Sequence, residues 1–127
     1  MQRNLAYREY GDAESFLKVT RGALERQEAA NGLMFGLVLR LIHEPNAYGS
    51  QPYYATVEST AGLQVAALMT PPYKLQIYAE LGYDQAGLEL VAEALLRGGW
   101  PVPGVMAHQA VAEAFATLWR EIGRAHV

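Results

Sequence analysis

The sequence contains no cysteine among its 127 residues, and this absence excludes several kinds of chemistry. Without thiols the chain forms no disulfide, has no thiolate nucleophile and builds no cysteine-rich zinc site. It also has no uninterrupted apolar run near the ~20 residues that a membrane-spanning helix needs. The opening stretch "MQRNLAYREYGDAESF" lacks the apolar core of a signal peptide. We therefore expect a cytoplasmic protein with no membrane partner.

Positive charge is scarce as well. The chain has 10 Lys and Arg against 13 Asp and Glu, for a formal net charge of −3. Its basic residues are scattered, so the sequence lacks the basic footprint of a nucleic-acid-binding protein, and we expect no nucleic-acid partner. The length fits one domain with a real core, which we place over residues 1–127.

Apolar residues recur at helical spacing in four segments, which predicts helices over about residues 13–27, 28–43, 84–97 and 109–122. Asp12 and Asp84 precede the first and third segments, where a carboxylate can accept from free backbone N–H groups and cap the helix. Pro45 should stop the second helix, and Gly98 and Gly99 should end the third.

Two packing expectations concern these helices. Gly32 and Gly36 lie one turn apart, and tight packing against a neighbouring element is a simpler explanation for them than a close-contact functional site. The last helix has one wide apolar stripe, which predicts that Phe115 and Trp119 are buried against a sheet. The stripe comprises Val111, Ala114, Phe115, Leu118, Trp119 and Ile122.

Strand patterns occupy the middle of the chain, in the segments "YYATVES", "LQVAALM", "KLQIYAE" and "VPGVMAH". Residues 59–62 read as a hairpin turn, and Pro71 and Pro72 should end the second strand because neither can donate to a ladder. "LQVAALM" is apolar on both faces and suits a covered central strand. The expected fold is a layered α/β arrangement: a helix pair, a three-stranded antiparallel meander, and then helix, parallel strand and helix.

This order, with the segments "NGLMFGLVLRL", "PYYATVES" and "VAALMTPPYKLQIY", resembles the N-terminal half of two-part bacterial proteins in the GNAT superfamily of N-acetyltransferases. The resemblance spans roughly residues 12–122. It implies a degenerate GNAT-like layered fold that lacks the last strands of a full GNAT domain. It also implies that acetyl-CoA is bound by a catalytic half, and that this chain is structural or shapes the substrate entrance.

GNAT enzymes hold the pyrophosphate of acetyl-CoA in a Q/R-x-x-G-x-G/A turn between a strand and a helix, where backbone N–H groups surround the anion. The matching position here is "AELGYDQAGLEL". Gly82 and Gly87 are five residues apart and do not form the motif, while Glu80 and Asp84 add negative charge beside the expected phosphate. We therefore expect no cofactor for this chain and no acetyl transfer by it, and we assign no cofactor-binding residue.

Other candidate chemistry is sparse. The three histidines, His43, His108 and His126, have no partner at metal-ligand spacing, so no metal site is predicted. His43 ends a helix, where a cation offsets the dipole. His108 lies at a strand-to-helix junction, where a structural or capping role is favoured over ligand binding.

No catalytic residue emerges from the remaining polar side chains. Glu25 and Glu28 indicate a solvated helix face rather than an acid–base pair. Ser15, Ser50 and Ser59 lie in no nucleophile motif. Four tyrosines could line a pocket, but ordinary packing on half-buried strands is the simpler explanation; these are Tyr48, Tyr53, Tyr54 and Tyr73.

Three functions stay open. The first is the non-catalytic domain that the GNAT resemblance implies. The second is a small acetyl-CoA-dependent N-acetyltransferase, or an acyl-CoA-binding protein, with an unconventional phosphate turn. The third is a ligand-sensing module with a pocket between the tyrosine-rich strands and the first two helices.

The expected partner is a second copy of the chain or a following catalytic domain. The segment "VPGVMAH" has no Lys or Glu to discourage strand pairing. A strand near Val105 would therefore offer an open sheet edge. We expect a homodimer that forms through this edge or through apolar helix faces.

Overall fold

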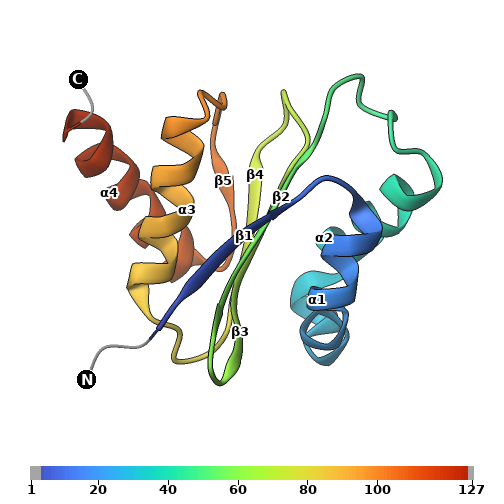
Figure 1. Ribbon diagram of the computed structural model, residues 1–127, viewed down its shortest axis with the longest axis horizontal. Coiled ribbons are helices and arrows are strands. Elements are labelled where there is room, and N and C mark those ends of the chain that lie inside the picture. The colour runs from blue at the N-terminus through green and yellow to red at the C-terminus, as the bar shows by residue number, and fades with distance from the viewer. Residues whose placement is uncertain (1–3, 126–127) are drawn as a thin grey trace.

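One mixed β-sheet with two helices on each face organises the chain (Figure 1). A computed structural model describes residues 4–125. The elements are β1 Ala6–Tyr10, α1 Ala13–Arg26, α2 Glu28–His43, β2 Tyr53–Ser59, β3 Gly62–Met69, β4 Leu75–Ala79, α3 Gln85–Arg97, β5 Val105–Met106 and α4 Gln109–Ala125.

The sheet has five strands in the order β1-β2-β3-β4-β5. The first four are antiparallel, and β5 pairs parallel to β4. The expected hairpin is confirmed, because Ser59 pairs with Gly62 across the turn. The parallel arrangement of the last two strands is confirmed as well, with α3 connecting them.

Strand β1 corrects the predicted element order. The predicted fold began with a helix pair and a three-stranded meander, whereas the structure has an additional edge strand, β1, so that four strands are antiparallel. β1 reads "AYREY" and is mostly exposed. With no β-branched residue and two charged ones, it lacks the composition that identifies a buried strand. It is held by pairing with β2, which the local sequence does not reveal.

The sheet separates two apolar cores. β3 lies in the middle of the sheet, as expected, and its residues alternate between the two sides. Val65, Ala67 and Met69 belong to the core beneath α3 and α4, whereas Ala66 and Leu68 belong to the core beneath α1 and α2. Both faces are therefore covered, which explains why the strand is apolar at every position from Val65 to Met69.

The helices begin and end close to the predicted positions. Asp12 caps α1 by accepting from the Ser15 N–H at 2.8 Å, and Asp84 caps α3 by accepting from the Ala86 N–H at 3.0 Å. α3 ends at Gly98 and Gly99, where Gly99 has a φ of 68°. The capping predictions are confirmed.

Helix α2 is buried on one side and exposed on the other. Its buried side is formed by Met34, Val38 and Leu41, but Leu33 is 61% exposed. Gly32 and Gly36 are also exposed, and a Cβ added at either would meet no atom within 4 Å. The prediction that these glycines permit tight packing within the chain was wrong, because they lie on the outer side of the helix.

Helix α4 carries the predicted apolar stripe. Val111, Phe115 and Leu118 are buried in the core shared with α3, and Phe115 is only 2% exposed. Trp119 stacks on Phe115 with ring centroids 5.9 Å apart, but it lies at the margin of this core and is only partly buried. Its predicted full burial is thus corrected. Among the described residues, no helix has both the length and the apolar character needed to cross a bilayer.

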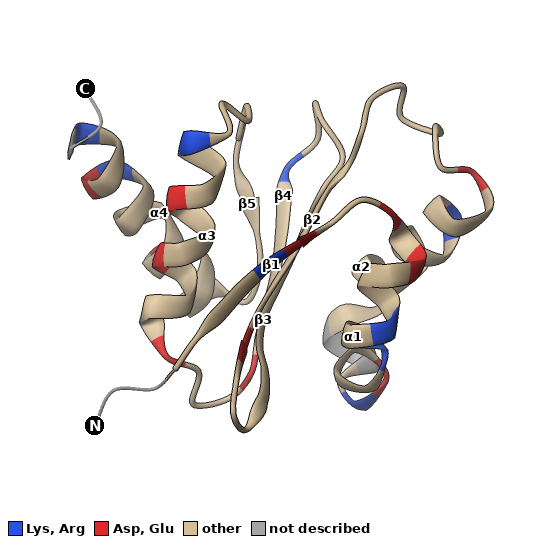
Figure 2. Cartoon of the chain, in the orientation of Figure 1, with Lys and Arg blue, Asp and Glu red and all other residues tan. Residues whose placement is uncertain are grey.

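Charged residues sit mainly on the helices and in the loops, while most positions of β2 to β5 are uncharged (Figure 2). Helix α1 carries both acidic and basic side chains, and Arg21 pairs with Glu25 at 3.3 Å. This pair supports the interpretation of Glu25 as part of a solvated helix face. The side chain of Glu28 lies outside the described residues.

Candidate functional site

The turn between β4 and α3 occupies the position of the phosphate-binding turn considered above. Three of its backbone donors bond within the chain. The N–H of Glu80 donates to the Gln64 carbonyl at 2.9 Å, and the N–H of Tyr83 donates to the Glu80 carbonyl at 3.0 Å. The N–H of Asp84 donates to the Gln64 side-chain oxygen at 3.2 Å, and Asp84 itself caps Ala86. These donors are therefore engaged where a phosphate would need them.

The two glycines of this turn have local structural roles. Gly82 has a φ of 76°, a conformation that L side chains rarely adopt. Gly87 lies in the first turn of α3, and a Cβ there would come within 3.2 Å of Val65 and 3.5 Å of Val57. Glycine at this position lets the helix approach the sheet closely, so it serves packing rather than a ligand.

Charge around the turn opposes an anion. The Glu80 carboxylate is 3.1 Å from Arg26 on α1. Burial and a hydrogen bond with Glu80 raise the pKa of Tyr78 to about 12. Arg26, Gln64 and Glu80 contribute to an open cleft of about 510 Å³ between α1 and the β2–β3 hairpin. Its one arginine is already paired with a carboxylate.

Neither described histidine lies in a reactive cluster. His43 is exposed in the last turn of α2, beside the helix C-terminus, as the dipole interpretation requires. His108 is exposed before α4, and its backbone carbonyl accepts from the Ala112 N–H at 2.9 Å; the role predicted for its side chain stays a prediction. His126 lies outside the described residues. Within residues 4–125, no three His, Asp or Glu side chains gather as metal ligands would.

The four candidate tyrosines do not share one pocket. Tyr53 and Tyr54 are neighbours on β2, so their side chains enter opposite cores. Tyr48 and Tyr73 contact each other edge to face, with ring centroids 5.6 Å apart, and Tyr48 packs at the margin of the core that contains Tyr54. Ordinary packing accounts for the buried two, because Tyr53 is 1% and Tyr54 is 3% exposed.

The serines are likewise structural where the structure shows their bonds. The Ser59 hydroxyl accepts from the Ala61 N–H at 3.1 Å and from the Gln64 side-chain amide at 3.3 Å. The Ser15 backbone N–H donates to the capping carboxylate of Asp12. Ser50 lies exposed in the loop before β2. None of these contacts pairs a serine with a base.

A chain of phenols that the sequence analysis missed links β1 to β2. The hydroxyls of Tyr7 and Tyr53 are 2.6 Å apart, and Tyr7 donates to the Glu9 carboxylate at 2.8 Å. Since each phenol has one hydrogen, Tyr53 donates to Tyr7. Burial raises the pKa of both phenols above their ordinary value, and Glu9 reinforces the shift by its negative charge.

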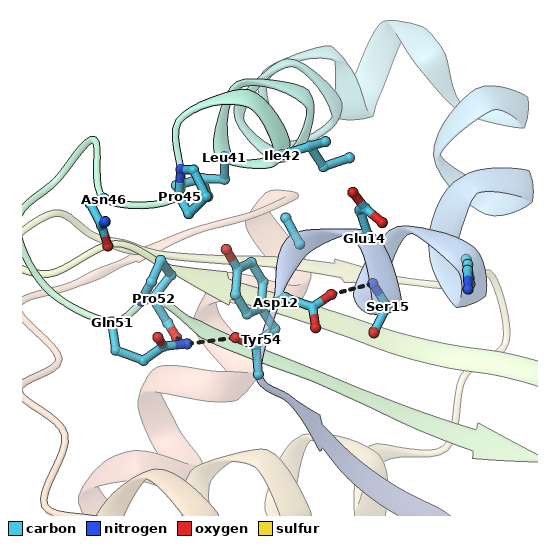
Figure 3. A pocket seen from close by; sticks show the side chains of 13 residues that line it. Asp12, Glu14, Ser15, Leu41, Ile42, Pro45, Asn46, Gln51, Pro52 and Tyr54 are labelled. Atoms are coloured by element: carbon cyan, nitrogen blue, oxygen red, sulfur yellow. Dashed lines mark hydrogen bonds between the residues drawn. The ribbon is translucent and has the colours of Figure 1, made fainter.

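The main candidate binding site is a cleft of about 380 Å³, the α1 cleft, at the N-terminus of α1 (Figure 3). Its apolar wall is formed by Leu41, Ile42 and Pro45 at the end of α2, which lie opposite Tyr54 of β2. The remaining lining residues are Gly11, Asp12, Ala13, Glu14, Ser15, Lys18, Asn46, Gln51 and Pro52.

The polar side of the α1 cleft is mixed in charge. Hydrogen bonds from the Ser15 backbone hold the pKa of Asp12 below its ordinary value, and Lys18 adds to the effect. Burial and the Asp12 charge raise the pKa of Tyr54 to about 12. Acidic groups thus outnumber the single lysine around this cleft, which disfavours a polyanionic ligand.

A second hollow, the Trp100 cleft, lies next to the α1 cleft and has a volume of about 400 Å³. The two clefts share the β1–α1 junction, where the Gln51 amide donates to the Gly11 carbonyl at 3.1 Å and to the Pro52 carbonyl at 3.2 Å. The Trp100 cleft is lined by Glu9, Tyr10, Gly11, Gln51, Pro52, Tyr53, Tyr54 and Trp100. Sequence analysis missed Glu9 and Trp100 because neither lies in a motif.

No protein-family model, curated protein or solved structure matches the chain. The function must therefore be inferred from the arrangement of these residues.

Proposed function

We propose that this chain is a non-catalytic GNAT-like domain, of the kind that precedes the catalytic half of two-part N-acetyltransferases. Its role is structural: it packs against a catalytic domain or a second copy and shapes the entrance for a substrate. The mixed five-stranded sheet with helices on both faces is compatible with this role. So is the segment from α1 to α4, in which a helix pair, a meander, a helix, a parallel strand and a helix follow one another.

The observation that carries the proposal is the internal bonding of the β4–α3 turn. A phosphate-binding turn needs backbone N–H groups that point to a ligand. Here the N–H groups of Glu80, Tyr83 and Asp84 bond to acceptors within the chain. Asp84 also places a carboxylate at the start of α3, where a diphosphate would have to approach. Both features oppose coenzyme A.

A thermal-shift titration with acetyl-CoA tests this proposal. A ligand at about 100 times its dissociation constant stabilises the folded state by about 2.7 kcal/mol, which would raise the melting temperature visibly. We expect no saturable rise. A saturable rise that is lost in Arg26→Gln, which removes the cation beside the turn, would instead support an acyl-CoA-binding protein or acetyltransferase with an unconventional turn.

The partner is expected at β5. This two-residue strand pairs with β4 on one side, and Met106 on it is 45% exposed. An edge strand presents backbone donors and acceptors to a partner. We propose that a second copy or a catalytic domain adds to the sheet there, with α4 beside the junction.

Analytical ultracentrifugation at micromolar concentration measures this association. We expect a homodimer that Met106→Lys dissociates, because a lysine on the edge discourages pairing. Leu81→Lys is the matched control, since Leu81 is fully exposed in the β4–α3 turn and away from the edge. A mass of one chain for the parent protein across a roughly tenfold dilution series would contradict self-association.

A second candidate function is a small-molecule-binding domain, and the α1 cleft favours it. This cleft lies between β2 and the first two helices, where the third sequence-based hypothesis put a pocket. Its volume of about 380 Å³ falls in the range typical of ligand sites. A ligand that shifts the resonances of residues 41–45 and 12–15 together, without affecting the β4–α3 turn, would support this function.

A further inference from the structure

The floor of the α1 cleft has one polar side chain. Four of the residues that line this cleft are buried, and these are Ala13, Leu41, Pro52 and Tyr54. Tyr54 alone among these four has a polar side chain. The charged lining residues are all exposed at the mouth, and these are Asp12, Glu14 and Lys18. The cleft therefore combines an apolar floor, a single hydroxyl and a charged rim.

The Tyr54 ring is fixed in the core, and its hydroxyl end lines the cleft. The ring packs against Phe16 of α1 with centroids 5.5 Å apart, and the residue is 3% exposed. Figure 3 shows the hydroxyl turned towards Leu41 and Pro45 at the end of α2. The ring face is thus used by the core, and the hydroxyl is the part of Tyr54 that a ligand can meet.

This hydroxyl has no hydrogen-bond partner within residues 4–125. The hydroxyl of Tyr10, on the neighbouring strand, bonds to Thr56 at 2.9 Å. Burial and the charge of Asp12 raise the pKa of Tyr54 to about 12, so the phenol keeps its proton at neutral pH. Leaving a buried donor without an acceptor is unfavourable, and an acceptor on a ligand would satisfy it.

The surroundings of Tyr54 favour an uncharged acceptor. An ionised group would lose its hydration against the apolar floor, where none of the described lining residues offers a buried counter-charge. A carboxylate would also meet the negative charges of Asp12 and Glu14 at the mouth. An ammonium supplies donors and no acceptor, so it would leave the Tyr54 hydrogen unpaired. A neutral carbonyl or hydroxyl oxygen on an apolar body avoids all of these costs.

We propose that the α1 cleft binds a small, uncharged molecule whose apolar body packs on Leu41 and Pro52 and whose oxygen accepts a hydrogen bond from Tyr54. This inference rests on the second candidate function, small-molecule binding in the α1 cleft, and names its class of ligand. The volume of about 380 Å³ lies near the lower end of the range for ligand sites, which suits a small molecule.

Benzamide is the probe, and amide-correlation NMR of the whole chain is the readout. We expect saturable shifts at residues 12–15, 41–45 and 54, with an affinity in the roughly millimolar range for a fragment of this size. Benzoate and benzamidine have nearly the same shape but carry a negative and a positive charge, and each should bind roughly tenfold more weakly. Benzyl alcohol in a parallel titration distinguishes the two neutral acceptors, because the tighter ligand shows whether a carbonyl or a hydroxyl fits.

A variant of Tyr54 tests the hydrogen bond. Tyr54→Phe removes the hydroxyl and keeps the ring that packs on Phe16, so benzamide should bind roughly tenfold more weakly. Circular dichroism checks that the variant folds. Tyr10→Phe is the matched control, because Tyr10 also packs on Phe16, with centroids 6.1 Å apart, but is not among the residues that line the α1 cleft. Its binding of benzamide should be unchanged.

Failure of the ligand class and failure of the site give different results. If a charged probe binds residues 12–15 and 41–45 more tightly than benzamide, the ligand class is wrong while the cleft remains a binding site. The same holds if Tyr54→Phe binds benzamide as the parent protein does, or if Tyr10→Phe weakens it equally. If no probe shifts these residues up to about 50 mM, the inference and the small-molecule function are both overturned.

Discussion

Helix α4 offers a direct test of how burial sets stability in this fold. Phe115 is 2% exposed and lies in the core shared with α3 and the sheet. Trp119, one turn later, stacks on it from the margin. The larger residue is therefore the less buried one. We compare Phe115→Ala with Trp119→Ala.

The magnitude follows from burial. Truncating a fully buried phenylalanine removes its transfer free energy and leaves a cavity, which costs about 3–5 kcal/mol. Trp119 leaves no enclosed cavity because solvent already reaches it, so its truncation should cost about 1–3 kcal/mol. A domain of this size has a free energy of unfolding of about 5–15 kcal/mol. The Phe115 variant should therefore be markedly closer to unfolding than the Trp119 variant.

Urea denaturation followed by circular dichroism measures both variants. Each midpoint shift is converted with the slope of the parent protein, and unchanged slopes show that the unfolded ensembles are comparable. Phe115→Leu serves as the control, because it retains most of the volume and should lose much less stability. The reasoning is refuted if Trp119→Ala costs as much as Phe115→Ala. That result would mean that a partner or second copy covers Trp119 in solution.

Three further predictions concern caps and phenols. Asp84→Ala should cost about 1 kcal/mol of unfolding free energy by urea denaturation, because the Ala86 N–H loses its cap; no loss would show that the cap is replaceable. Tyr7→Phe should lower the free energy of unfolding more than Tyr53→Phe does, because it leaves the buried Tyr53 hydroxyl without its acceptor, at a cost of about 1–3 kcal/mol. If denaturation experiments gave the reverse order, Tyr53 would not be the donor in that hydrogen bond. Tyr54 and Tyr78 should ionise at about pH 12 by ultraviolet absorbance. Because the folded pKa of each lies above the ordinary 10.0, the stability they contribute is present below pH 10 and lost as pH rises towards 12. If both tyrosines ionised near pH 10, the prediction of raised pKa values would be wrong.

The sequence predicted elements whose signals are local. The α3 segment has a cap at Asp84, an apolar stripe and a glycine stop, and each of these acts within one or two turns. β3 was recognisable because a strand covered on both faces is apolar at most of its positions, as the run from Val65 to Met69 is. The hairpin follows from a short connection, and the parallel order of β4 and β5 follows from the helical crossover α3 between them.

What the sequence did not predict depends on contacts between distant segments. β1 looks like a polar N-terminal stretch until β2 pairs with it. The Trp100 cleft brings together Glu9 from β1, Tyr53 from β2 and Trp100 from the loop after α3, so no local spacing could have shown it. Leu33 continued the apolar pattern of α2, but the helix turns it outward. The pattern identifies a helix without identifying how much of its surface is covered.

The attachment of β1 has a consequence for dynamics. Its partner strand follows two helices and a loop in the sequence, so the pairing of Ala6 with Glu58 closes a long stretch of chain. As an exposed edge strand, β1 should open in local fluctuations at a lower free energy than β3. Each opening would carry Glu9 away from the Trp100 cleft and separate Tyr7 from Tyr53. Closure of β1 and formation of the Tyr7–Tyr53 hydrogen bond would then be linked equilibria, so Tyr7→Phe should speed amide exchange along the whole strand.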